Sequence, residues 1–242
     1  MNLIDAFDIK EKELIAIVGG GGKTTLLFAL AEAIPGRVVI TTTTRIFAAQ
    51  MNLATAVSEY TSEVEQNWED WLADLEIKLT KHGSCLVVGQ VQGEKAFGVP
   101  PGLPAKLLAS LFVDAVVVEA DGSRMRPIKA PAEHEPVIPN GTTLVIPTVG
   151  IDALDGTIEE VAHRPELVRK LLESGASRPV LSEVEVLGVG DIAQLLVSEQ
   201  GGAKNLPDSA RLIPLINKVE TDTQLNSARQ IAHHALRITH HE

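Results

Sequence analysis

The chain alternates short apolar runs with longer segments in which apolar residues recur every three or four positions. The short runs are rich in Val, Ile and Leu without polar alternation, which is typical of strands buried on both faces of a parallel sheet. The predicted strands are residues 14–18, 37–42, 85–90, 95–99, 113–119, 143–147 and 212–216. We therefore predict one α/β domain over residues 1–242, with a mainly parallel sheet and helices on both faces.

Three helices can be bounded from the sequence. Residues 24–34 precede a Pro-Gly pair, which stops a helix. Residues 62–81 carry an apolar stripe at helical spacing, start with a capping box at Ser62 and end at Gly83. A C-terminal helix is predicted around residues 225–236 from the same periodicity.

Two connecting segments stand out. A turn at residues 92–94 should join strands 85–90 and 95–99. Residues 121–140 are rich in proline and charge, so we predict a long functional loop there.

A glycine-rich turn lies between the first strand and the first helix. Such a turn exposes unpaired backbone N–H groups, and glycine lets the backbone curl around an anion. Lys23 is placed to neutralise outer phosphates, and the Thr24 hydroxyl is placed to hold Mg²⁺. We predict that the phosphate-binding residues are Gly19, Gly20, Gly21, Gly22, Lys23, Thr24 and Thr25.

The strict Walker pattern fails, because Ile17 stands where its first glycine belongs. What is left is a shorter Gly-x-x-Gly-Lys-Thr-Thr loop, which resembles the ATP-binding loop of the Mur ligases. The alternative is a mobile glycine turn, which does not explain Lys-Thr-Thr between a strand and a helix.

The second strand ends in Thr41-Thr42-Thr43-Thr44-Arg45. Ligands bind at the carboxyl ends of strands in parallel sheets, so Thr43, Thr44 or Arg45 is a candidate for contact with a phosphate, a metal-bound water or a substrate anion. The alternative is that the threonines only suit a strand.

The strand 113–119 ends in acids, Glu119-Ala-Asp121. A carboxylate at such a strand end commonly holds Mg²⁺ opposite the loop threonine, and either residue is a candidate. We expect the two side chains to point in different directions and to have separate roles. The alternative is an ordinary Asp-Gly turn.

The next segment reverses the sign of the local charge, with Arg124, Arg126 and Lys129 within six residues. Beside a phosphate site it indicates capture of an anion, either the nucleotide or a second substrate. The alternative is a solvated surface loop. The candidates for catalysis are Lys23, Thr43, Arg45, Asp121, Arg124 and Lys129.

Asn217-Lys218-Val219-Glu220 follows the last strand and resembles the Asn-Lys-x-Asp element with which GTPases read guanine. We predict that Asn217, Lys218 and Glu220 contribute to nucleotide binding. Glutamate in place of aspartate argues against recognition of guanine. The alternative to nucleotide binding is that the segment is only the end of a strand.

Composition narrows the class of protein. The formal net charge of −11 disfavours nucleic acid as a partner. Apolar runs are too short to cross a membrane, a signal peptide is not apparent, and the single cysteine, Cys85, excludes an internal disulfide. We expect a cytoplasmic protein. His240 and His241 are expected to lie in a disordered terminus.

Seven segments occur together in this order: GGGGKTT, TTTTR, VEADGSR, RPIKAP, HEPVIP, AHRPE and LINKVE. The set resembles the YqeC family, accessory proteins for selenium-dependent molybdenum hydroxylases, over roughly residues 10–238. The resemblance implies a P-loop NTPase-like fold and a role in maturing a selenium-containing molybdenum cofactor.

The leading hypothesis is an Mg²⁺-dependent enzyme that binds ATP or GTP and hydrolyses it or transfers its phosphoryl group, with Thr24 and Glu119 or Asp121 at the metal. The second is a nucleotide-switched chaperone or scaffold for a molybdenum hydroxylase, in which residues 121–140 order on binding. A third is a protein that binds a sugar phosphate or cofactor phosphate. An anionic small molecule is a further expected partner.

Overall fold

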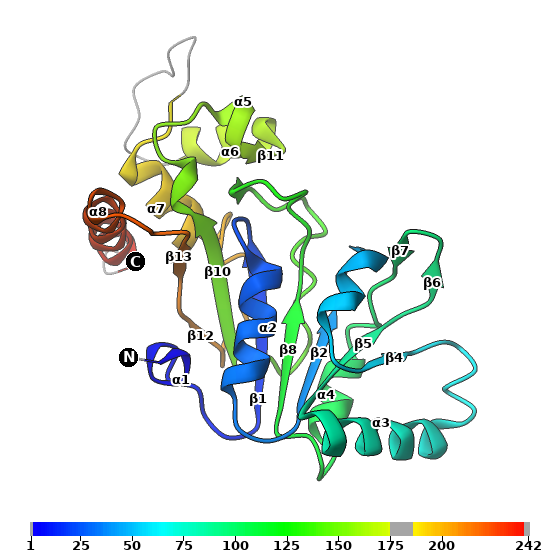
Figure 1. Cartoon of the computed structure of the whole chain (residues 1–242). Coiled ribbons are helices and arrows are strands. Elements are labelled where there is room, and N and C mark those ends of the chain that lie inside the picture. Colours follow the sequence, from blue (N-terminus) through cyan, green and yellow to red (C-terminus); the bar gives the residue numbers. More distant parts are fainter. Residues whose placement is uncertain (1, 175–185, 240–242) are drawn as a thin grey trace.

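The computed structural model of the chain describes residues 2–174 and 186–239 and confirms the α/β class (Figure 1). The central sheet is parallel and has the order β12–β10–β1–β8–β2–β5–β4, with β13 also paired to β10. The strands are β1 (Glu13–Gly19), β2 (Val38–Thr42), β4 (Val57–Glu59), β5 (Ser84–Val88), β8 (Ala115–Glu119), β10 (Leu144–Gly150), β12 (Arg211–Leu212) and β13 (Leu215–Asn217).

The central strands are apolar throughout because both of their faces are covered. The register pairs Ile15 with Val117 and Leu144, so the first strand lies between the eighth and the tenth. The helices are α1 (Leu3–Ala6), α2 (Lys23–Ala33), α3 (Trp68–His82), α4 (Leu103–Leu108), α5 (Ile158–Val161), α6 (Pro165–Glu173), α7 (Val189–Val197) and α8 (Asp222–Thr239), with 3-10 turns η1 (Ala48–Leu53) and η2 (Ile151–Ala153).

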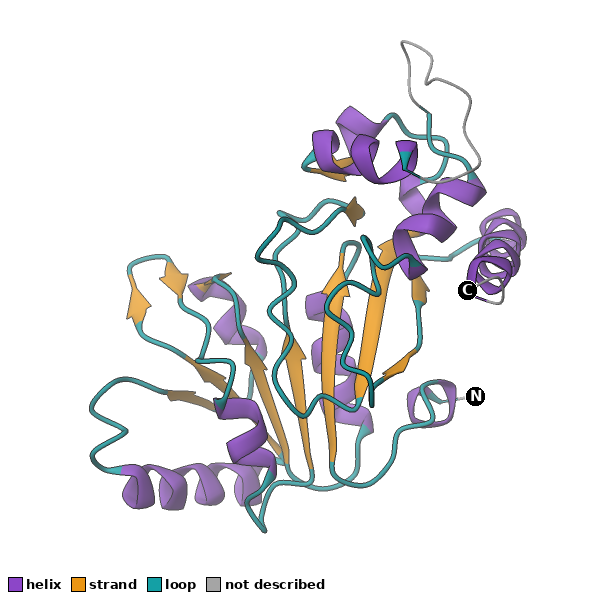
Figure 2. Ribbon diagram, turned by 180° about the vertical axis from the view of Figure 1, so that it is seen from behind, coloured by secondary structure: helices purple, strands orange, loops and turns teal. Residues whose placement is uncertain are grey.

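Alternate residues of β1 face two different helical layers. Ile15 packs with Leu27 of α2 on one face, whereas Leu14 packs with Leu79 of α3 and Leu107 of α4 on the other. Figure 2 shows α2 behind the sheet and α3 and α4 in front of it. Helices on both faces of the sheet are therefore confirmed.

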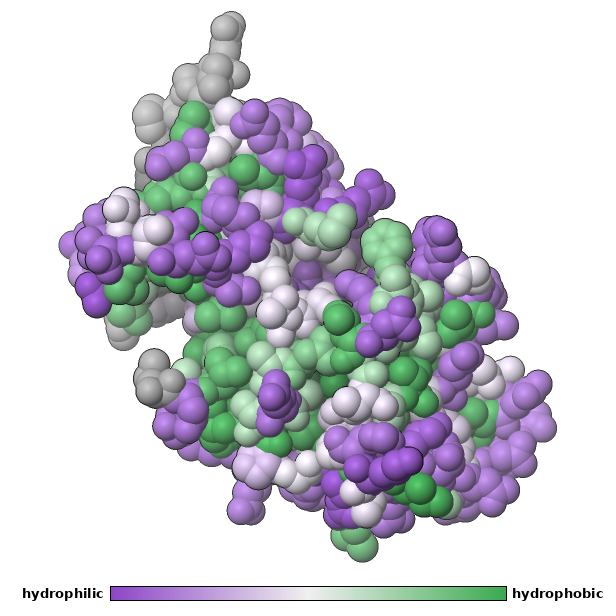
Figure 3. Space-filling view, in the orientation of Figure 1, coloured by the Kyte–Doolittle hydropathy of each residue, from purple (hydrophilic) through white to green (hydrophobic). Residues whose placement is uncertain are grey.

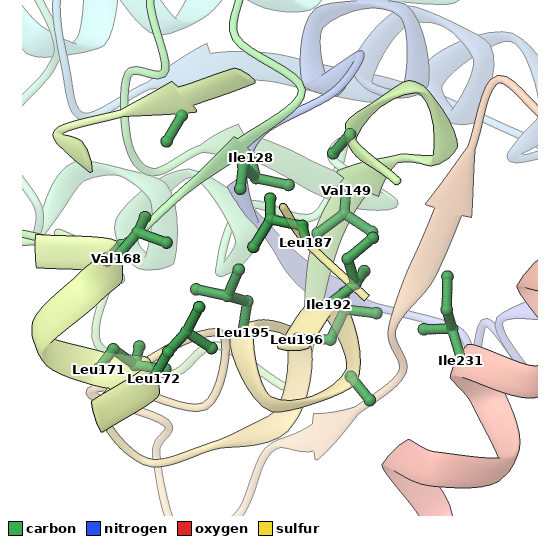
Figure 4. Close-up of a cluster of buried hydrophobic side chains, with 14 of the residues drawn as sticks. Ile128, Val149, Val168, Leu171, Leu172, Leu187, Ile192, Leu195, Leu196 and Ile231 are labelled. Carbon is green, nitrogen blue, oxygen red and sulfur yellow. The ribbon is translucent and has the colours of Figure 1, made fainter. Parts of the chain in front are cut away.

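A further apolar cluster lies at the carboxyl end of β10 and combines the predicted C-terminal helix with α6 and α7, which were not predicted. Leu195 and Leu196 of α7 pack with Val168 of α6 and with Ile128 from the 121–140 segment, and α8 adds Ile231 (Figure 4). This cluster anchors the 121–140 segment to the helices at one end of the sheet.

Two predicted boundaries are wrong. The α3 helix begins at Trp68 rather than at residue 62, and its N-cap is Asn67, because the apolar face that anchors it, Leu75 and Leu79, lies further along the chain. The predicted strand 212–216 is divided into β12 and β13, since Pro214 has no N–H to donate. The predicted helix end at Gly83 is confirmed by its positive φ of 75°.

The connections largely follow the sequence. The predicted turn joins β6 (Val91–Gln92) to β7 (Lys95–Ala96), which also pairs with β3 (Ile46–Phe47). It was predicted to join strands 85–90 and 95–99, but these end at Val88 and Ala96, so both predicted strands are too long. The 121–140 segment is mostly irregular, but it contains β9 (Ile128–Lys129), which pairs with β11 (Ala162–His163).

In the part of the chain that the structure describes, the helices are all too short or too polar to cross a membrane. His240 and His241 lie outside the described residues.

The two sides of α3 provide a test of this packing. Leu75→Ala should lower the free energy of unfolding by about 2–5 kcal/mol, because a fully buried side chain would leave a cavity. Ile77→Ala on the same helix should change it by less than about 0.5 kcal/mol, because Ile77 is exposed. Urea unfolding of both variants measures the difference, and equal losses would contradict the assigned faces.

Candidate functional site

An open pocket of about 350 Å³ lies where α2 begins, at the carboxyl ends of the central strands. In Figure 3 the face of the molecule above α2 is hollowed at this place. The lining residues come from the glycine loop (residues 19–25), the segment after β2, the end of β8, the basic segment and the segment after β13. They are Gly22, Lys23, Thr24, Thr25, Arg45, Ile46, Phe47, Gln50, Glu119, Gly122, Ser123, Arg124, Met125 and Lys218.

The glycine loop requires glycine for two physical reasons. Gly19, Gly21 and Gly22 have φ values of +93°, +62° and +102°, which side chains rarely allow. A Cβ on Gly21 would also lie 2.1 Å from the backbone nitrogen of Gly150. The loop is thus packed directly against neighbouring backbone, and it curls as the sequence predicts.

The start of α2 directs backbone donors at the pocket. The helical hydrogen bonds of α2 begin with the N–H of Leu26, which donates to the Gly22 carbonyl at 3.0 Å. Helix geometry leaves the N–H groups of Lys23, Thr24 and Thr25 without a helical carbonyl, and all three residues line the pocket. The positive end of the helix dipole adds to this favourable field for an anion.

Lys23 is buried beneath the loop. Its Nζ donates to the Gly19 carbonyl at 2.6 Å and lies 3.3 Å from Asp121 Oδ1 and 3.9 Å from Glu119 Oε1. Only 3% of the side chain is exposed. The two carboxylates therefore compensate an ammonium group that would be costly to bury alone.

Glu119 connects β8 to the helix across the pocket wall. The Thr24 hydroxyl donates to Glu119 Oε2 at 3.0 Å, and the amide of Gln50 lies 3.4 Å from the same hydroxyl. Burial raises the pKa of the Glu119 carboxyl, while Lys23 and the Thr24 hydroxyl act in the opposite direction. A hydroxyl and a carboxylate oxygen thus lie side by side where the sequence predicted a metal.

Asp121 is almost completely buried and is surrounded by donors. The Gly19 N–H lies 3.1 and 3.0 Å from its two oxygens, and Lys129 Nζ lies 3.1 Å from Oδ2. The expectation that Glu119 and Asp121 point in different directions is wrong, because residues two apart in an extended chain share a face. Both carboxylates lie beside Lys23.

The 121–140 segment extends this network of charges. Lys129 Nζ donates to the Gly122 carbonyl at 2.9 Å and to Glu135 Oε2 at 2.7 Å, and Arg164 at the start of α6 forms a two-point contact with the same carboxylate. Burial by itself would raise the pKa of Glu135, but hydrogen bonds from Arg164 and Lys129 outweigh it and lower the pKa to about 2. The segment is thus joined to the glycine loop by buried ion pairs.

Thr43 and Arg45 differ in position although they are two residues apart. The Thr43 hydroxyl donates to the Val137 carbonyl at 2.8 Å, and Thr43 does not line the pocket. Arg45 does line it, with its guanidinium 4.6 Å from the centre of the Phe97 ring.

The basic segment is also divided. Arg124 lines the pocket, whereas Arg126 donates to the Glu160 carbonyl. Arg124 and Met125 both have positive φ, +49° and +62°, which is uncommon, and both residues are exposed and line the pocket.

The segment after β13 approaches the glycine loop from the other side. The Asn217 amide donates to the Gly21 carbonyl at 3.0 Å, and Lys218 lines the pocket while its Nζ donates to Asp152 at 2.6 Å. Glu220 is exposed and lies outside the lining.

The structure thus places half of the predicted site residues in the lining of one pocket and adds others. Gln50, Phe47 and Met125 line it without a motif that would have marked them. Glu135 and Arg164 were missed as functional residues, although a lysine in a loop as apolar as Ile128-Lys129-Ala130 requires a carboxylate partner.

The Glu135 network has a pH-dependent consequence. Glu135→Gln should lower the free energy of unfolding at neutral pH, because the folded protein favours the ionised carboxylate. Its pKa falls from 4.5 to about 2 on folding, so this stabilisation is present above pH 4.5 and is lost as the pH falls towards 2.

The difference between the two proteins should therefore shrink over that interval, which urea unfolding at a series of pH values measures. Glu94→Gln, at an exposed turn, is the control and should show no such trend. A difference that stays constant with pH would contradict the assignment.

Comparison with known proteins agrees with the sequence motifs. The family model described as YqeC protein matches residues 15–166. A relative from Escherichia coli strain K12, named "Uncharacterized protein YqeC", is 31% identical over 229 residues, which cover 89% of this chain and 80% of the relative. No solved structure matches the chain. Because the family model covers more than half of the chain and the relative matches along most of both sequences, this chain belongs to the YqeC family.

Proposed function

We propose that the chain is an Mg²⁺-dependent nucleotide-binding protein with a P-loop NTPase-like fold, in which the glycine loop holds the phosphates of ATP or GTP. The observation that carries the proposal is the contact between the Thr24 hydroxyl and Glu119 Oε2 at 3.0 Å, beside Lys23, in the wall of the pocket. In P-loop NTPases a loop Ser or Thr and an acid at a neighbouring strand end hold the metal together.

Phosphate binding is supported by the donors that face the pocket. The N–H groups at the start of α2 and the positive end of its dipole favour an anion. Lys23 adds a full positive charge beneath the loop, and Arg45 and Arg124 supply two more from the pocket walls. This charge distribution suits a polyphosphate in an otherwise acidic protein.

The metal assignment is supported by the chemistry of the available oxygens. Mg²⁺ commonly takes one or two protein oxygens and fills its other positions with water and phosphate. Among the described residues no three His, Cys, Asp or Glu side chains form a metal cage. Thr24 and Glu119 therefore fit a metal that the nucleotide itself helps to coordinate, and bound Mg²⁺ would neutralise charge on the phosphates.

Geometry favours Glu119 over Asp121 as the residue at the metal. Asp121 already accepts from Gly19 and pairs with Lys23 and Lys129. We assign to it the task of holding the loop and Lys23 in place, with Lys129 supporting it. The position of Glu220 outside the pocket lining gives no support to guanine reading by that residue.

The proposed biological role rests on the motifs shared with the YqeC family. We place the protein in the maturation of a selenium-containing molybdenum cofactor, working in the cytoplasm, where nucleotide and Mg²⁺ are at hand. The reaction class we favour is NTP hydrolysis or phosphoryl transfer, because an acid, a lysine and a guanidinium surround the place of the outer phosphates.

A second candidate is a nucleotide-switched chaperone for a molybdenum hydroxylase. The observation that favours it is the run of contacts from Lys23 through Asp121, Lys129 and Glu135 to Arg164 at the start of α6. This run joins the phosphate site to an outer helical layer on which a partner could act.

Removing the Lys23 ammonium should sharply reduce NTP turnover. Lys23→Ala should reduce NTP turnover at least about 100-fold, since a pre-placed positive charge at the outer phosphates is lost. A coupled phosphate-release assay measures turnover, and a thermal-shift titration with Mg²⁺–ATP and Mg²⁺–GTP measures binding. Lys81→Ala, at an exposed lysine of α3, is the matched control.

Because Lys23→Ala leaves Asp121 short of a partner in the interior, Thr24→Ala provides a second test. It should weaken the Mg²⁺ dependence of nucleotide binding by about tenfold while leaving binding of the metal-free nucleotide nearly unchanged. Full turnover in Lys23→Ala, or an unchanged metal dependence in Thr24→Ala, would contradict the proposal.

The two candidate functions differ in what a partner does. An enzyme should turn over NTP alone, whereas a switch should bind nucleotide tightly with negligible turnover and retain a purified molybdenum hydroxylase only in one nucleotide state. Pull-down with NTP, NDP and no nucleotide, together with turnover with and without the hydroxylase, separates them. Glu135→Gln should break nucleotide control of retention only in the second case, and Glu94→Gln serves again as control.

A further inference from the structure

The two sides of the pocket differ chemically, because the strands on either side of β1 carry different side chains. Towards β10 and β13 lies Asn217, whose amide contacts the Gly21 carbonyl. Towards β8 and β2 lie Glu119 and, after β2, Arg45 and Gln50. The Thr24–Glu119 contact is therefore on the β8 and β2 side of the loop.

If a nucleotide binds as proposed above, this arrangement sets its direction. Thr24 and Glu119 would hold the metal, which would supply positive charge to the outer phosphates, so the terminal phosphate would lie by these two residues. The nucleoside would then extend towards the β13 side, where Lys218 lines the pocket. The space by Arg45 is left for whatever receives the terminal phosphoryl group.

The residues in that space have an uncommon composition. Arg45 and Arg124 line the pocket, and within residues 2–174 and 186–239 neither forms an ion pair with a carboxylate. Two large apolar side chains lie beside them in the lining: Phe47, which is 55% exposed, and Met125, which is 88% exposed. Guanidinium groups suit carboxylates and phosphates, and an exposed ring and thioether suit a flat apolar group.

We infer that this side of the pocket binds a second substrate, a small molecule that carries both an oxyanion and a flat apolar ring, and that the oxyanion accepts the terminal phosphoryl group. Arg45 and Arg124 hold the oxyanion, while Phe47 and Met125 pack against the ring. The inference rests on the proposed function and names the class of acceptor for it.

The lining also indicates why the acceptor is an oxyanion rather than an alcohol. An alcohol must lose a proton as it attacks, which calls for a general base within reach. Glu119 is the single carboxylate among the described lining residues, it is assigned to the metal, and no histidine is among them. A carboxylate or phosphate ester is already deprotonated at neutral pH.

The step balances without a proton. An oxygen of the acceptor forms a bond to the terminal phosphorus, and the bond from that phosphorus to the bridging oxygen breaks. The electron pair of the broken bond stays on the bridging oxygen of the departing nucleoside diphosphate. A carboxylate acceptor becomes an acyl phosphate, and a phosphate ester becomes a phosphoanhydride.

The test uses the full chain with Mg²⁺ and a non-hydrolysable NTP analogue, probed with benzoate and with phenyl phosphate. Thermal shift and calorimetry should show that at least one probe binds, and that Arg45→Ala and Arg124→Ala each weaken it by about tenfold. Phe47→Ala should weaken the same probe, whereas cyclohexanol and benzyl alcohol should not bind. Arg229→Ala and Leu111→Ala, at exposed positions away from the pocket, are the matched controls.

Failure of this inference is distinct from failure of the proposed function. If the nucleotide analogue alone does not raise the melting temperature of the protein, the proposed function is contradicted. If the analogue binds but neither oxyanion does, or the arginine variants weaken the analogue as much as the probe, the acceptor site is overturned and nucleotide binding stands.

Turnover distinguishes the two kinds of oxyanion. With Mg²⁺ and hydrolysable NTP, a carboxylate acceptor yields a hydroxamate when hydroxylamine is added, whereas a phosphate ester yields a phosphoanhydride that hydroxylamine does not trap. Either product supports the inference. Phosphorylated benzyl alcohol would overturn it, because that product requires a base that the inference excludes.

Discussion

The ion pair between Lys23 and Asp121 is the interaction on which the rest of the site depends. Both groups are buried, with side-chain exposures of 3% and 2%, and a buried charge is tolerated only when it is paired. Asp121 also accepts from the Gly19 N–H, so one carboxylate fixes both the curl of the glycine loop and the position of its lysine. Removing it would leave two lysines facing each other in the interior.

The same constraint explains why a proline-rich segment folds over the site. The buried network contains three cations and three carboxylates, so its formal charge is balanced, and residues 129 and 135 supply one charge of each sign. The members are Lys23, Lys129, Arg164, Glu119, Asp121 and Glu135. The segment is therefore held by charge compensation in addition to the apolar contacts of Ile128, and its irregular backbone is compatible with a fixed position.

The features that were predictable are those that depend on local sequence. The glycine loop, the acids at the end of β8 and the exposed hairpin turn each follow from a short motif with its own geometry. The α6 and α7 helices were not predicted, because each has only nine residues and so shows only about two and a half turns of periodicity. Their apolar residues pack on one another, on Ile128 and, for α7, on β10. The Ser62 capping box failed because tertiary packing at Leu75 determines where α3 is stable. The two carboxylate partners of Lys129, Asp121 and Glu135, are near it in sequence. Arg164, which pairs with Glu135, is distant in sequence and is brought to the network by the pairing of β9 with β11.

Asp121 and Glu119 differ in the number and charge of the hydrogen-bond donors around them. Asp121 is surrounded by one backbone N–H and two ammonium groups, and these contacts hold its oxygens in the interior. Glu119 lines the pocket, and its nearest donor is a hydroxyl rather than a charge. Burial raises the pKa of Glu119, so its carboxylate form is under-compensated. A divalent cation would supply the missing positive charge at that point and lower the pKa again. Two acids that look equivalent in the sequence thus have different surroundings: Asp121 is enclosed by the donors of the loop and of two lysines, whereas Glu119 lines the pocket.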